Sequence, residues 1–590
     1  MTKPSAEFQS AVQVRHIGSW QFELRDDEFA DLKFDGQLVL RSVRAVIRDR
    51  NWNTADLVID EIAETSNENS GSVSFSVHSK GFCSAFAGTI RLEILGNQAT
   101  FSLDLKSQSD YLTNRTGFIV LHSPVAAGAD LFIEHSSGES ALSVFPAAVS
   151  PNQPVFDIAA LQWTQGSKVI DVAFAGDVFE MEDQRNWTDA SYKTYNRPLA
   201  LPFPYSVAAG EHVVQSVTVS VESLADQSGA DLAVSGPSRI ELLPAGKFAQ
   251  IQVAAATAPG ENPSLTPVGD TVLLELDLQS TNWQAALKRV AQTSKHLDVR
   301  AIVAAQSNDA ALAASLESLA AALEALPDVS VTRIAVFDAG THVASPAGTE
   351  FLMKMPYFAK SKPEILGGAR SHFTELNRNP QSILAGADAV AFSITPFFHA
   401  LSNEQLFESI AMQRIVAKQA VQLASGKPVH VGPIALRPRF NNVATGPQPT
   451  PSMVDLSEGY GAELAGSSDP RQTSPELAAW VIASAAALSV QGIDSITYFE
   501  QWGPRGIADS KGSDYAVAEA VRVLAELAGQ EVFVGESADG FVWALAAKNG
   551  ERVTILVSNL NRFAVEIEVS VLGQTRQIKL GPLAWASAVI

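Results

Sequence analysis

The chain has 590 residues, of which 46% are apolar and 18% are charged. Its 42 Lys and Arg against 64 Asp and Glu give a formal net charge of -22 at pH 7, and this charge argues against nucleic acid and anionic membranes as partners, because both would be repelled. A neutral small molecule such as a sugar is compatible with it. The length is too great for one hydrophobic core and predicts about three or four domains.

Residues 1–255 are predicted to form an antiparallel β-sandwich. Val217, Val219 and Val221 alternate with polar residues, which is typical of a strand with one buried face, and Gly96-Asn97 has the composition of a hairpin turn. The strands expected in this part are Trp20–Leu24, Leu38–Ile47, Gly71–Val77, Gly88–Leu95, Gln98–Leu105 and Val213–Val221.

Cys83 is the only cysteine, so the chain cannot form an intrachain disulfide or a cysteine-based zinc cluster, and we expect a buried structural thiol. The N-terminus lacks the apolar segment of a signal peptide, and no stretch offers about 18 uninterrupted apolar residues, so a cytoplasmic protein without a membrane span is predicted. Metal-binding and nucleotide-binding motifs are absent, and neither a metal nor a cofactor is expected. Both a monomer and a homo-oligomer remain open.

A segment rich in proline and glycine at 256–269 is predicted to be an interdomain linker. From there to residue 529, short apolar runs alternate with amphipathic helices, which predicts a parallel sheet covered by helices and, from the number of runs, a (β/α)8 barrel over 270–529. The apolar runs taken as strands are Val272–Leu278, Val299–Ala305, Thr332–Asp338, Glu364–Ala369, Ala389–Ile394, Pro428–Ile434 and Ser495–Glu500.

Leu312, Leu316, Leu319 and Leu323 recur at helical spacing and predict an outer barrel helix. Ser402 and Gln405 are spaced as a capping box, which predicts the start of another helix. Residues 530–590 return to alternating strands, with Asn549-Gly550 as a hairpin signal, and predict a small C-terminal β-sandwich.

In a barrel enzyme the active site is built at the carboxyl ends of the strands. Glu375 follows the apparent fourth strand and Glu500 ends the last one, so the two are predicted to be catalytic carboxylates that divide acid and base roles. A structural ion pair, for example with Arg378, is the alternative for either glutamate. Asn377 and Arg378 beside Glu375, and Trp502 beside Glu500, are predicted to bind substrate.

Two other loops after predicted strands hold weaker candidates for substrate binding. Arg437, Arg439 and Asn441 follow the strand that ends at Ile434, and a guanidinium there could bind a carbonyl or a carboxylate. An exposed basic loop explains them almost as well. His399 follows another strand and could be a base or a donor, although a lone histidine is more often structural.

The stretch FEMEDQRNWTDASYKTY at 179–195 matches neither the period of a strand nor that of a helix. Its charged and aromatic side chains, among them Asp183, Arg185 and Trp187, could bind a sugar at the barrel mouth. A network that locks the two domains together is equally favoured by the composition.

Five motifs are distributed along the chain: NRTGFIVLHS at Asn114–Ser123, EMEDQRNWTDASYKTY at Glu180–Tyr195, FTELNR at Phe373–Arg378, RPRFNN at Arg437–Asn442 and DPRQTS at Asp469–Ser474. Together these motifs resemble the D-apionate lactonase family. That family has an N-terminal β domain, a glycosidase-like barrel and a C-terminal β domain, and the resemblance implies hydrolysis of D-apionolactone to D-apionate in bacterial apiose breakdown. YFEQWG at the last strand departs from the YYETTG expected of the family.

Three functions therefore stay open. The first is a sugar lactonase, and the second is a glycoside hydrolase that uses Glu375 and Glu500 on a small glycoside. The third is a carbohydrate-binding protein with a degenerate barrel, against which the carboxylates at two strand ends argue.

Overall fold

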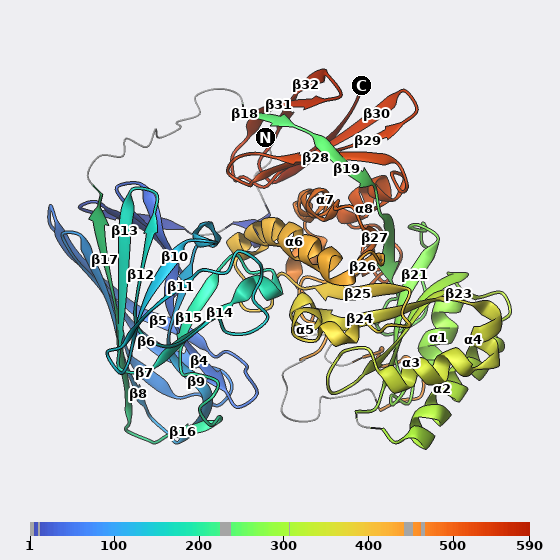
Figure 1. The fold of residues 1–590 in the computed structure, drawn as a ribbon, viewed down its shortest axis with the longest axis horizontal. Helices are drawn as coiled ribbons and strands as arrows, with labels where there is room; N and C mark the ends of the chain where they lie inside the picture. The colour runs from blue at the N-terminus through green and yellow to red at the C-terminus, as the bar shows by residue number, and fades with distance from the viewer. Residues whose placement is uncertain (1–4, 10–11, 225–237, 306, 442–451, 462–465) are drawn as a thin grey trace.

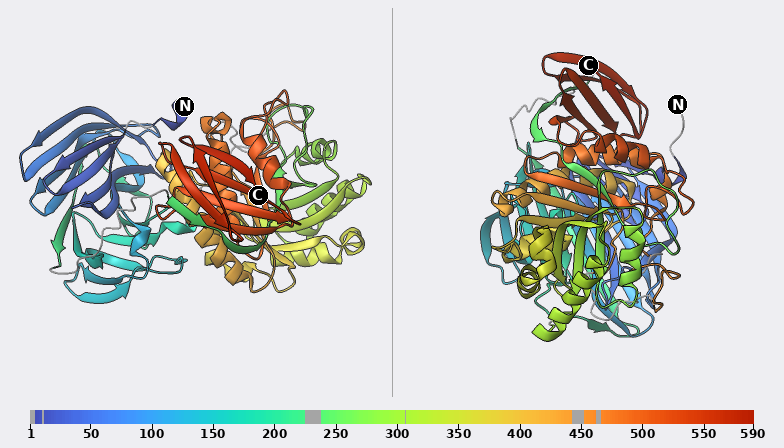
Figure 2. Two further views of the ribbon diagram at one scale, coloured as in Figure 1. Left: turned by 90° about the horizontal axis from the view of Figure 1, so that it is seen from above. Right: turned by 90° about the vertical axis from the view of Figure 1, so that its right-hand side faces the viewer.

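The computed structural model describes residues 5–9, 12–224, 238–305, 307–441, 452–461 and 466–590. They form an N-terminal β domain, a closed barrel of eight parallel strands and a C-terminal β domain (Figure 1). This confirms the predicted fold class. The C-terminal domain rests on the barrel beside helices α7 (Leu477–Leu488) and α8 (Val517–Ala525), as Figures 1 and 2 show.

The N-terminal domain, described as far as residue 224, is one hydrogen-bonded system of 17 antiparallel strands. Its core is aromatic: Phe29 and Phe75 stack with ring centroids 4.9 Å apart, and Phe101 meets Phe29 edge-on. The strands are β1 (Gln13–Ile17), β2 (Trp20–Arg25), β3 (Glu28–Phe34), β4 (Gln37–Asp49), β5 (Asp56–Ser66), β6 (Ser70–Lys80), β7 (Phe86–Leu95), β8 (Gln98–Ser107), β9 (Tyr111–His122), β10 (Asp130–His135), β11 (Ser140–Val144), β12 (Val155–Gln165), β13 (Lys168–Ala175), β14 (Phe179–Asp183), β15 (Tyr192–Asn196), β16 (Tyr205–Val207) and β17 (His212–Ser223).

Local sequence signals in this domain are confirmed, with one exception. Gly96 and Asn97 connect β7 and β8, whose Leu95 and Gln98 pair across the turn. Val217, Val219 and Val221 are all buried. The exception is Cys83, which is exposed and not a buried thiol, because it lies in the turn between β6 and β7 and not on a strand face.

The C-terminal domain is made of two sheets, and each sheet includes one strand from before the barrel. β18 (Ser238–Glu241) pairs in parallel with β31, and β19 (Leu243–Lys247) pairs antiparallel with β28. The sequence placed these two segments in the N-terminal domain, and that assignment is corrected here. The other strands are β28 (Glu531–Glu536), β29 (Val542–Asn549), β30 (Arg552–Asn559), β31 (Val565–Val571), β32 (Gln574–Leu580) and β33 (Ala584–Val589).

The barrel begins earlier than predicted. β20 (Gln250–Ala254), which was assigned to the N-terminal domain, is the first barrel strand and closes the barrel by pairing with β27 (Ile493–Glu500). Residues 256–269 are therefore the loop after this strand and not an interdomain linker. The barrel strands between β20 and β27 are β21 (Thr271–Asp277), β22 (His296–Val303), β23 (Ser330–Asp338), β24 (Glu364–His372), β25 (Ala389–Ile394) and β26 (Val429–Ile434).

Helices cover the outside of the barrel (Figure 1). Leu312, Leu316, Leu319 and Leu323 are buried along α2 (Asp309–Glu324), as their spacing predicts. The N-terminus of α6 (Asn403–Ala424) is capped by Ser402, whose hydroxyl accepts a hydrogen bond from the backbone amide of Gln405. The remaining helices are α1 (Trp283–Ala291), α3 (Pro346–Lys354), α4 (Pro356–Ser361), α5 (Phe373–Arg378), α7 and α8, with short 3₁₀ turns η1 (Ala6–Phe8), η2 (Pro124–Ala126), η3 (Gln184–Trp187), η4 (Pro380–Ser382) and η5 (Pro470–Thr473).

Candidate active site

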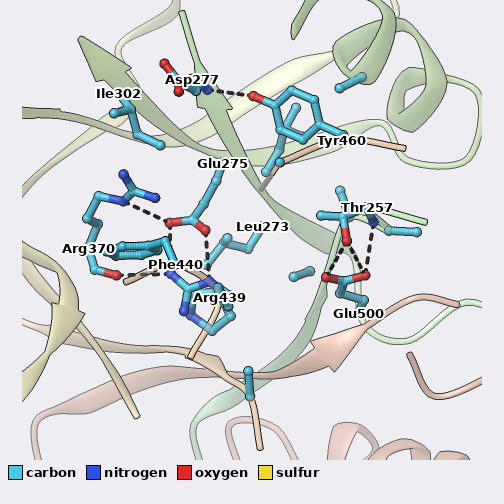
Figure 3. Close-up of a pocket in the computed structure, with 18 of the residues that line it drawn as sticks. Thr257, Leu273, Glu275, Asp277, Ile302, Arg370, Arg439, Phe440, Tyr460 and Glu500 are labelled. Carbon is cyan, nitrogen blue, oxygen red and sulfur yellow. Dashed lines mark hydrogen bonds and ion pairs between the residues drawn. The ribbon is translucent and has the colours of Figure 1, made fainter. Parts of the chain in front are cut away.

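The barrel mouth holds a cavity of about 580 Å³, large enough for a small sugar. It lies at the carboxyl ends of β20, β21 and β27, where barrel enzymes carry their chemistry. Figure 3 shows two glutamates in it, Glu275 and Glu500, each held by its own set of donors. The polar and aromatic residues that line the cavity include Thr257, Asn262, Glu275, Asp277, Arg289, His342, Arg370, Arg439, Phe440, Asn441, Tyr460, Glu500, Gln501 and Arg505.

Glu500 ends β27 and is held in one orientation. Its carboxylate accepts hydrogen bonds from the backbone amide of Thr257 at 3.0 Å and from the hydroxyl of Thr257 at 2.9 Å, and Arg505 lies 3.0 Å from Oε1. Only 6% of Glu500 is exposed. Such donors fix a carboxylate while leaving lone pairs for a bound molecule, since an ionised carboxylate has about four acceptor positions.

Glu275, on β21, faces the same cavity between two arginines (Figure 3). Arg439 binds it with both Nε and Nη2, at 3.0 and 2.9 Å, and Nε of Arg370 lies 3.6 Å away. Removal from water alone would raise the pKa of Glu275, but the charges of Arg439 and Arg370 outweigh it and hold the pKa below its ordinary value. Glu275 is therefore ionised at neutral pH.

Phe440 lines the cavity and contacts two of its polar residues. Its ring lies under the guanidinium of Arg370, 3.9 Å from the centroid, and 4.9 Å from the imidazole of His342. Burial, assisted by the charge of Arg370, lowers the pKa of His342 to about 4. His342 is thus neutral at pH 7, and its Nδ1 makes no hydrogen bond within the described part of the chain.

Tyr460 offers a further donor. Its hydroxyl oxygen accepts a hydrogen bond of 2.6 Å from the backbone amide of Asp277, so the phenolic hydrogen must point elsewhere. Burial raises the pKa of Tyr460, so the phenol keeps its proton at neutral pH. The cavity thus combines anchored carboxylates with neutral and cationic donors.

Glu275, Asp277 and Tyr460 were not predicted from the sequence as site residues. The signal for the first two was present, because Glu275 and Asp277 alternate in an otherwise apolar strand, VLLELDL, and so point to the same face of it. Thr257 was missed because its segment has the composition of a linker. No local sequence pattern marks Tyr460, which lies in the long loop after β26 and is far along the chain from the end of that strand.

The predicted site residues separate into groups. Glu500, Arg439 and Asn441 line the cavity, whereas Trp502 is buried beneath it and donates its Nε1 hydrogen to Asn262 Oδ1 at 3.1 Å. His399 and Arg437 line a second cavity of about 340 Å³, which Arg439, Phe440 and Asn441 also border.

Glu375, Asn377 and Arg378 are not among the residues that line either cavity. They belong to α5, which packs against the N-terminal domain: the amide of Asn377 donates to Val149 O at 3.0 Å, and Nε of Arg378 donates to Pro151 O at 2.8 Å. Glu375 is half-buried there, and burial raises its pKa. The cavity holds Glu275 and Glu500, whereas the catalytic role of Glu375 stays a prediction.

The stretch at 179–195 is buried between the N-terminal domain and the barrel. Arg185 forms a bidentate ion pair with Asp183, at 2.8 and 2.7 Å, and also donates to Pro146 O at 2.7 Å. Trp187 stacks on Phe398 of the barrel with the ring centroids 6.0 Å apart. The contacts of Arg185 with Asp183 and Pro146 lie within the N-terminal domain, whereas Trp187 contacts the barrel. Asp183, Arg185 and Trp187 line neither cavity.

In the described part of the chain, no three His, Cys, Asp or Glu side chains gather closely enough to hold a metal ion. Nor does any helix of this part have the length and apolar character needed to cross a membrane.

Both larger domains match family models. The model described as "D-apionate lactonase, N-terminal domain" matches residues 2–224, and the one described as "D-apionate lactonase, TIM barrel domain" matches residues 252–529. The chain belongs to the D-apionate lactonase family. A D-apionate lactonase from Brucella anthropi is 27% identical over 551 residues, which are 87% of this chain and 87% of that protein. The family model of the barrel begins close to β20, in agreement with the corrected boundary.

Solved structures similar to this family member include carbohydrate-active enzymes. A GH30 endoxylanase from Clostridium papyrosolvens has a TM-score of 0.38 and 10% identity, and covers 60% of this chain and 99% of its own. SrfJ from Salmonella typhimurium has a TM-score of 0.39 and 10% identity, and covers 62% of this chain and 95% of its own.

Proposed function

We propose that this protein hydrolyses a sugar lactone, and that its substrate is D-apionolactone, which it opens to D-apionate. Lactone opening is ester hydrolysis, so family membership makes the chain a hydrolase. The observation that carries the proposal is the pair of anchored glutamates, Glu275 and Glu500, in a sugar-sized cavity at the barrel mouth. The bacterial apiose pathway and a cytoplasmic location remain predictions from the sequence.

In this proposal Glu500 is the general base. Its carboxylate is oriented by Thr257 and Arg505, and a free lone pair can take a proton from the water that attacks the lactone carbonyl. The new bond joins the water oxygen to the carbonyl carbon, and the proton passes to Glu500. Because the base is already oriented, no free energy has to be spent on reorienting it during the reaction.

Attack on the carbonyl places a negative charge on its oxygen, which needs donors already in position. Arg439 and the free phenolic hydrogen of Tyr460 are the candidates, because both groups line the cavity and are themselves held by the protein. When the tetrahedral intermediate collapses, the ring oxygen leaves and takes up a proton. Glu500, now protonated, can return the proton that it accepted.

The state of Glu275 favours a lactone over a glycoside as substrate. Glycoside hydrolysis requires a carboxylic acid with a raised pKa to protonate the leaving oxygen. The arginines beside Glu275 instead lower its pKa, so it is a poor proton donor at neutral pH. Its role in the proposal is to hold Arg439 and Arg370 toward the substrate.

Proton release separates the two reactions, because only lactone opening forms an acid. Purified protein is added to a panel of sugar γ-lactones that includes D-apionolactone, with aryl glycosides assayed in parallel. We expect acid formation above the spontaneous rate with D-apionolactone and none from the glycosides. Release of the aryl group without any acid from a lactone would make the glycoside hydrolase the better assignment.

The depressed pKa of Glu275 leads to a prediction about pH. A carboxyl whose pKa is lower in the folded state stabilises the fold above its unfolded pKa, about 4.3, and this contribution is lost as the pH falls through the folded value. We expect Glu275→Gln to destabilise the protein at pH 7 and to have progressively less effect toward pH 3, measured by urea unfolding. The exposed Glu61→Gln is the control. An effect of Glu275→Gln that grows on acidification would contradict the ion-pair argument.

A further inference from the structure

The second cavity, of about 340 Å³, is formed jointly by two domains. The N-terminal domain contributes Arg48, near the end of β4, and residues 51–54 of the loop between β4 and β5, and the barrel contributes loops that follow β25 and β26. Arg48, Arg437 and Arg439 line it, together with Trp52 and the neutral polar side chains of Asn51 and Asn441. Among the described residues that line it, none is Asp or Glu. An anion would therefore meet attraction there without repulsion from a lining carboxylate.

The three arginines differ in how far they are already neutralised. Nε of Arg437 lies 2.9 Å from Asp469, and Arg439 is paired with Glu275. Among the described residues no carboxylate forms an ion pair with Arg48, although the charges of Glu182 and Asp189 act on it at longer range, and its buried Nε makes no hydrogen bond there. A buried donor without a partner is costly, and an anionic ligand would satisfy it.

Arg48 keeps its charge in spite of this position. Burial, together with the nearby charge of Arg115, lowers the pKa of Arg48 to about 10, which still leaves it protonated at neutral pH. His399 on the opposite wall is neutral, because burial and the neighbouring cations lower its pKa well below the ordinary value. His399 therefore adds no charge of its own.

The two cavities adjoin, since Arg439, Phe440 and Asn441 line both. A lactone is neutral, but its hydrolysis product is a carboxylate. Glu275 and Glu500 repel that charge in the first cavity, where Arg439, Arg370 and Arg505 are already paired with them. The favourable position for a newly formed carboxylate is beside Arg48 in the second cavity.

We propose that the second cavity binds the carboxylate of a sugar acid. The identity of this acid rests on the function proposed above, where it is the product of lactone opening, D-apionate. The N-terminal domain is then part of the binding machinery through Arg48. Trp52, on the loop that follows β4, also lines the cavity and adds an aromatic surface for the carbon skeleton of the acid.

Binding is measured by titration calorimetry with D-apionate, with its uncharged amide and with inorganic phosphate. We expect the full-length protein to bind D-apionate at least tenfold more tightly than the amide, and Arg48→Gln to remove most of this difference. Arg48→Lys, which keeps the charge, is expected to retain part of it. Arg91→Gln is the matched control, because it removes an exposed arginine that pairs with Glu93 on the surface of the same domain.

Equal binding of D-apionate and its amide by the unmodified protein would overturn the proposal, as would unchanged D-apionate binding in Arg48→Gln. Tighter binding of phosphate than of D-apionate would assign the cavity to a phosphate-bearing ligand instead. If Arg48→Gln fails to fold, the unmodified protein is titrated at increasing salt concentration. Salt must then weaken the binding of D-apionate more than the binding of the amide. None of these measurements requires turnover. A protein that binds the acid but opens no lactone would therefore refute the proposed function and keep this site.

Discussion

Replacing Glu500 by Gln is expected to lower kcat for lactone opening by about 10²- to 10⁴-fold, the usual contribution of a general base. The amide is nearly the same size, and its single oxygen, placed where Oε2 lies, can still accept hydrogen bonds from the backbone amide and the hydroxyl of Thr257, but it cannot take a proton from water. Because the substrate contacts are retained, KM should change less than kcat. Initial rates of proton release with D-apionolactone measure both parameters.

Glu375→Gln, assayed in parallel with Glu500→Gln, decides between two candidate catalytic pairs. One is Glu375 with Glu500, predicted from the sequence, and the other is Glu275 with Glu500, found in the cavity. If Glu275 and Glu500 carry the site, Glu375→Gln loses little activity, because Glu375 lines neither cavity. Full activity in Glu500→Gln, or a loss of comparable size in Glu375→Gln, would return Glu375 to the mechanism. Circular dichroism of both variants confirms that a loss is not caused by unfolding.

Arg185→Ala is expected to destabilise the protein by about 3–5 kcal/mol, since it leaves the buried carboxylate of Asp183 without its cation. The Asp183 and Arg185 side chains are 0% and 1% exposed, so water cannot replace the lost partner. The substitution also frees the carbonyls of Pro146, Ala147 and Ala148, to which Arg185 donates. The midpoint of urea unfolding measures the loss.

The double variant Asp183→Asn with Arg185→Met separates the cost of an unpaired charge from the loss of packing. Because no charge is left buried, it should be more stable than Arg185→Ala alone. Both variants should keep the KM of the parent protein while they remain folded. A changed KM with unchanged stability would instead place Arg185 in substrate binding, the alternative that the sequence left open.

Strands were predictable where one face is buried and a turn residue ends the run, as for β7 and β8 around Gly96-Asn97. β20 was missed because its five residues, QIQVA, are too short to show a period and are followed by prolines and glycines. β18 and β19 were misassigned for a different reason. Each completes a sheet with strands about 300 residues later in the chain, and no local pattern records such a partner.

The candidate site was predictable only in part, for a similar reason. Position at the end of an apolar strand identified Glu500, and the loop after β26 identified Arg439 and Asn441. Glu375 satisfies the same rule, yet the chain turns into α5 directly after β24, and this glutamate lines neither cavity. Which way a loop carries a side chain depends on the neighbouring domain and not on the strand before it.

The position of β18 and β19 bears on how the protein is made. Both strands leave the ribosome before the barrel does, but their partners β31 and β28 follow only after it. At about 5–20 residues per second, these strands wait some tens of seconds with unpaired edges. Pro244 in β19 and the shortness of both strands limit pairing with other chains during that time. A chain that ends after the barrel would keep these edges open permanently and is expected to aggregate.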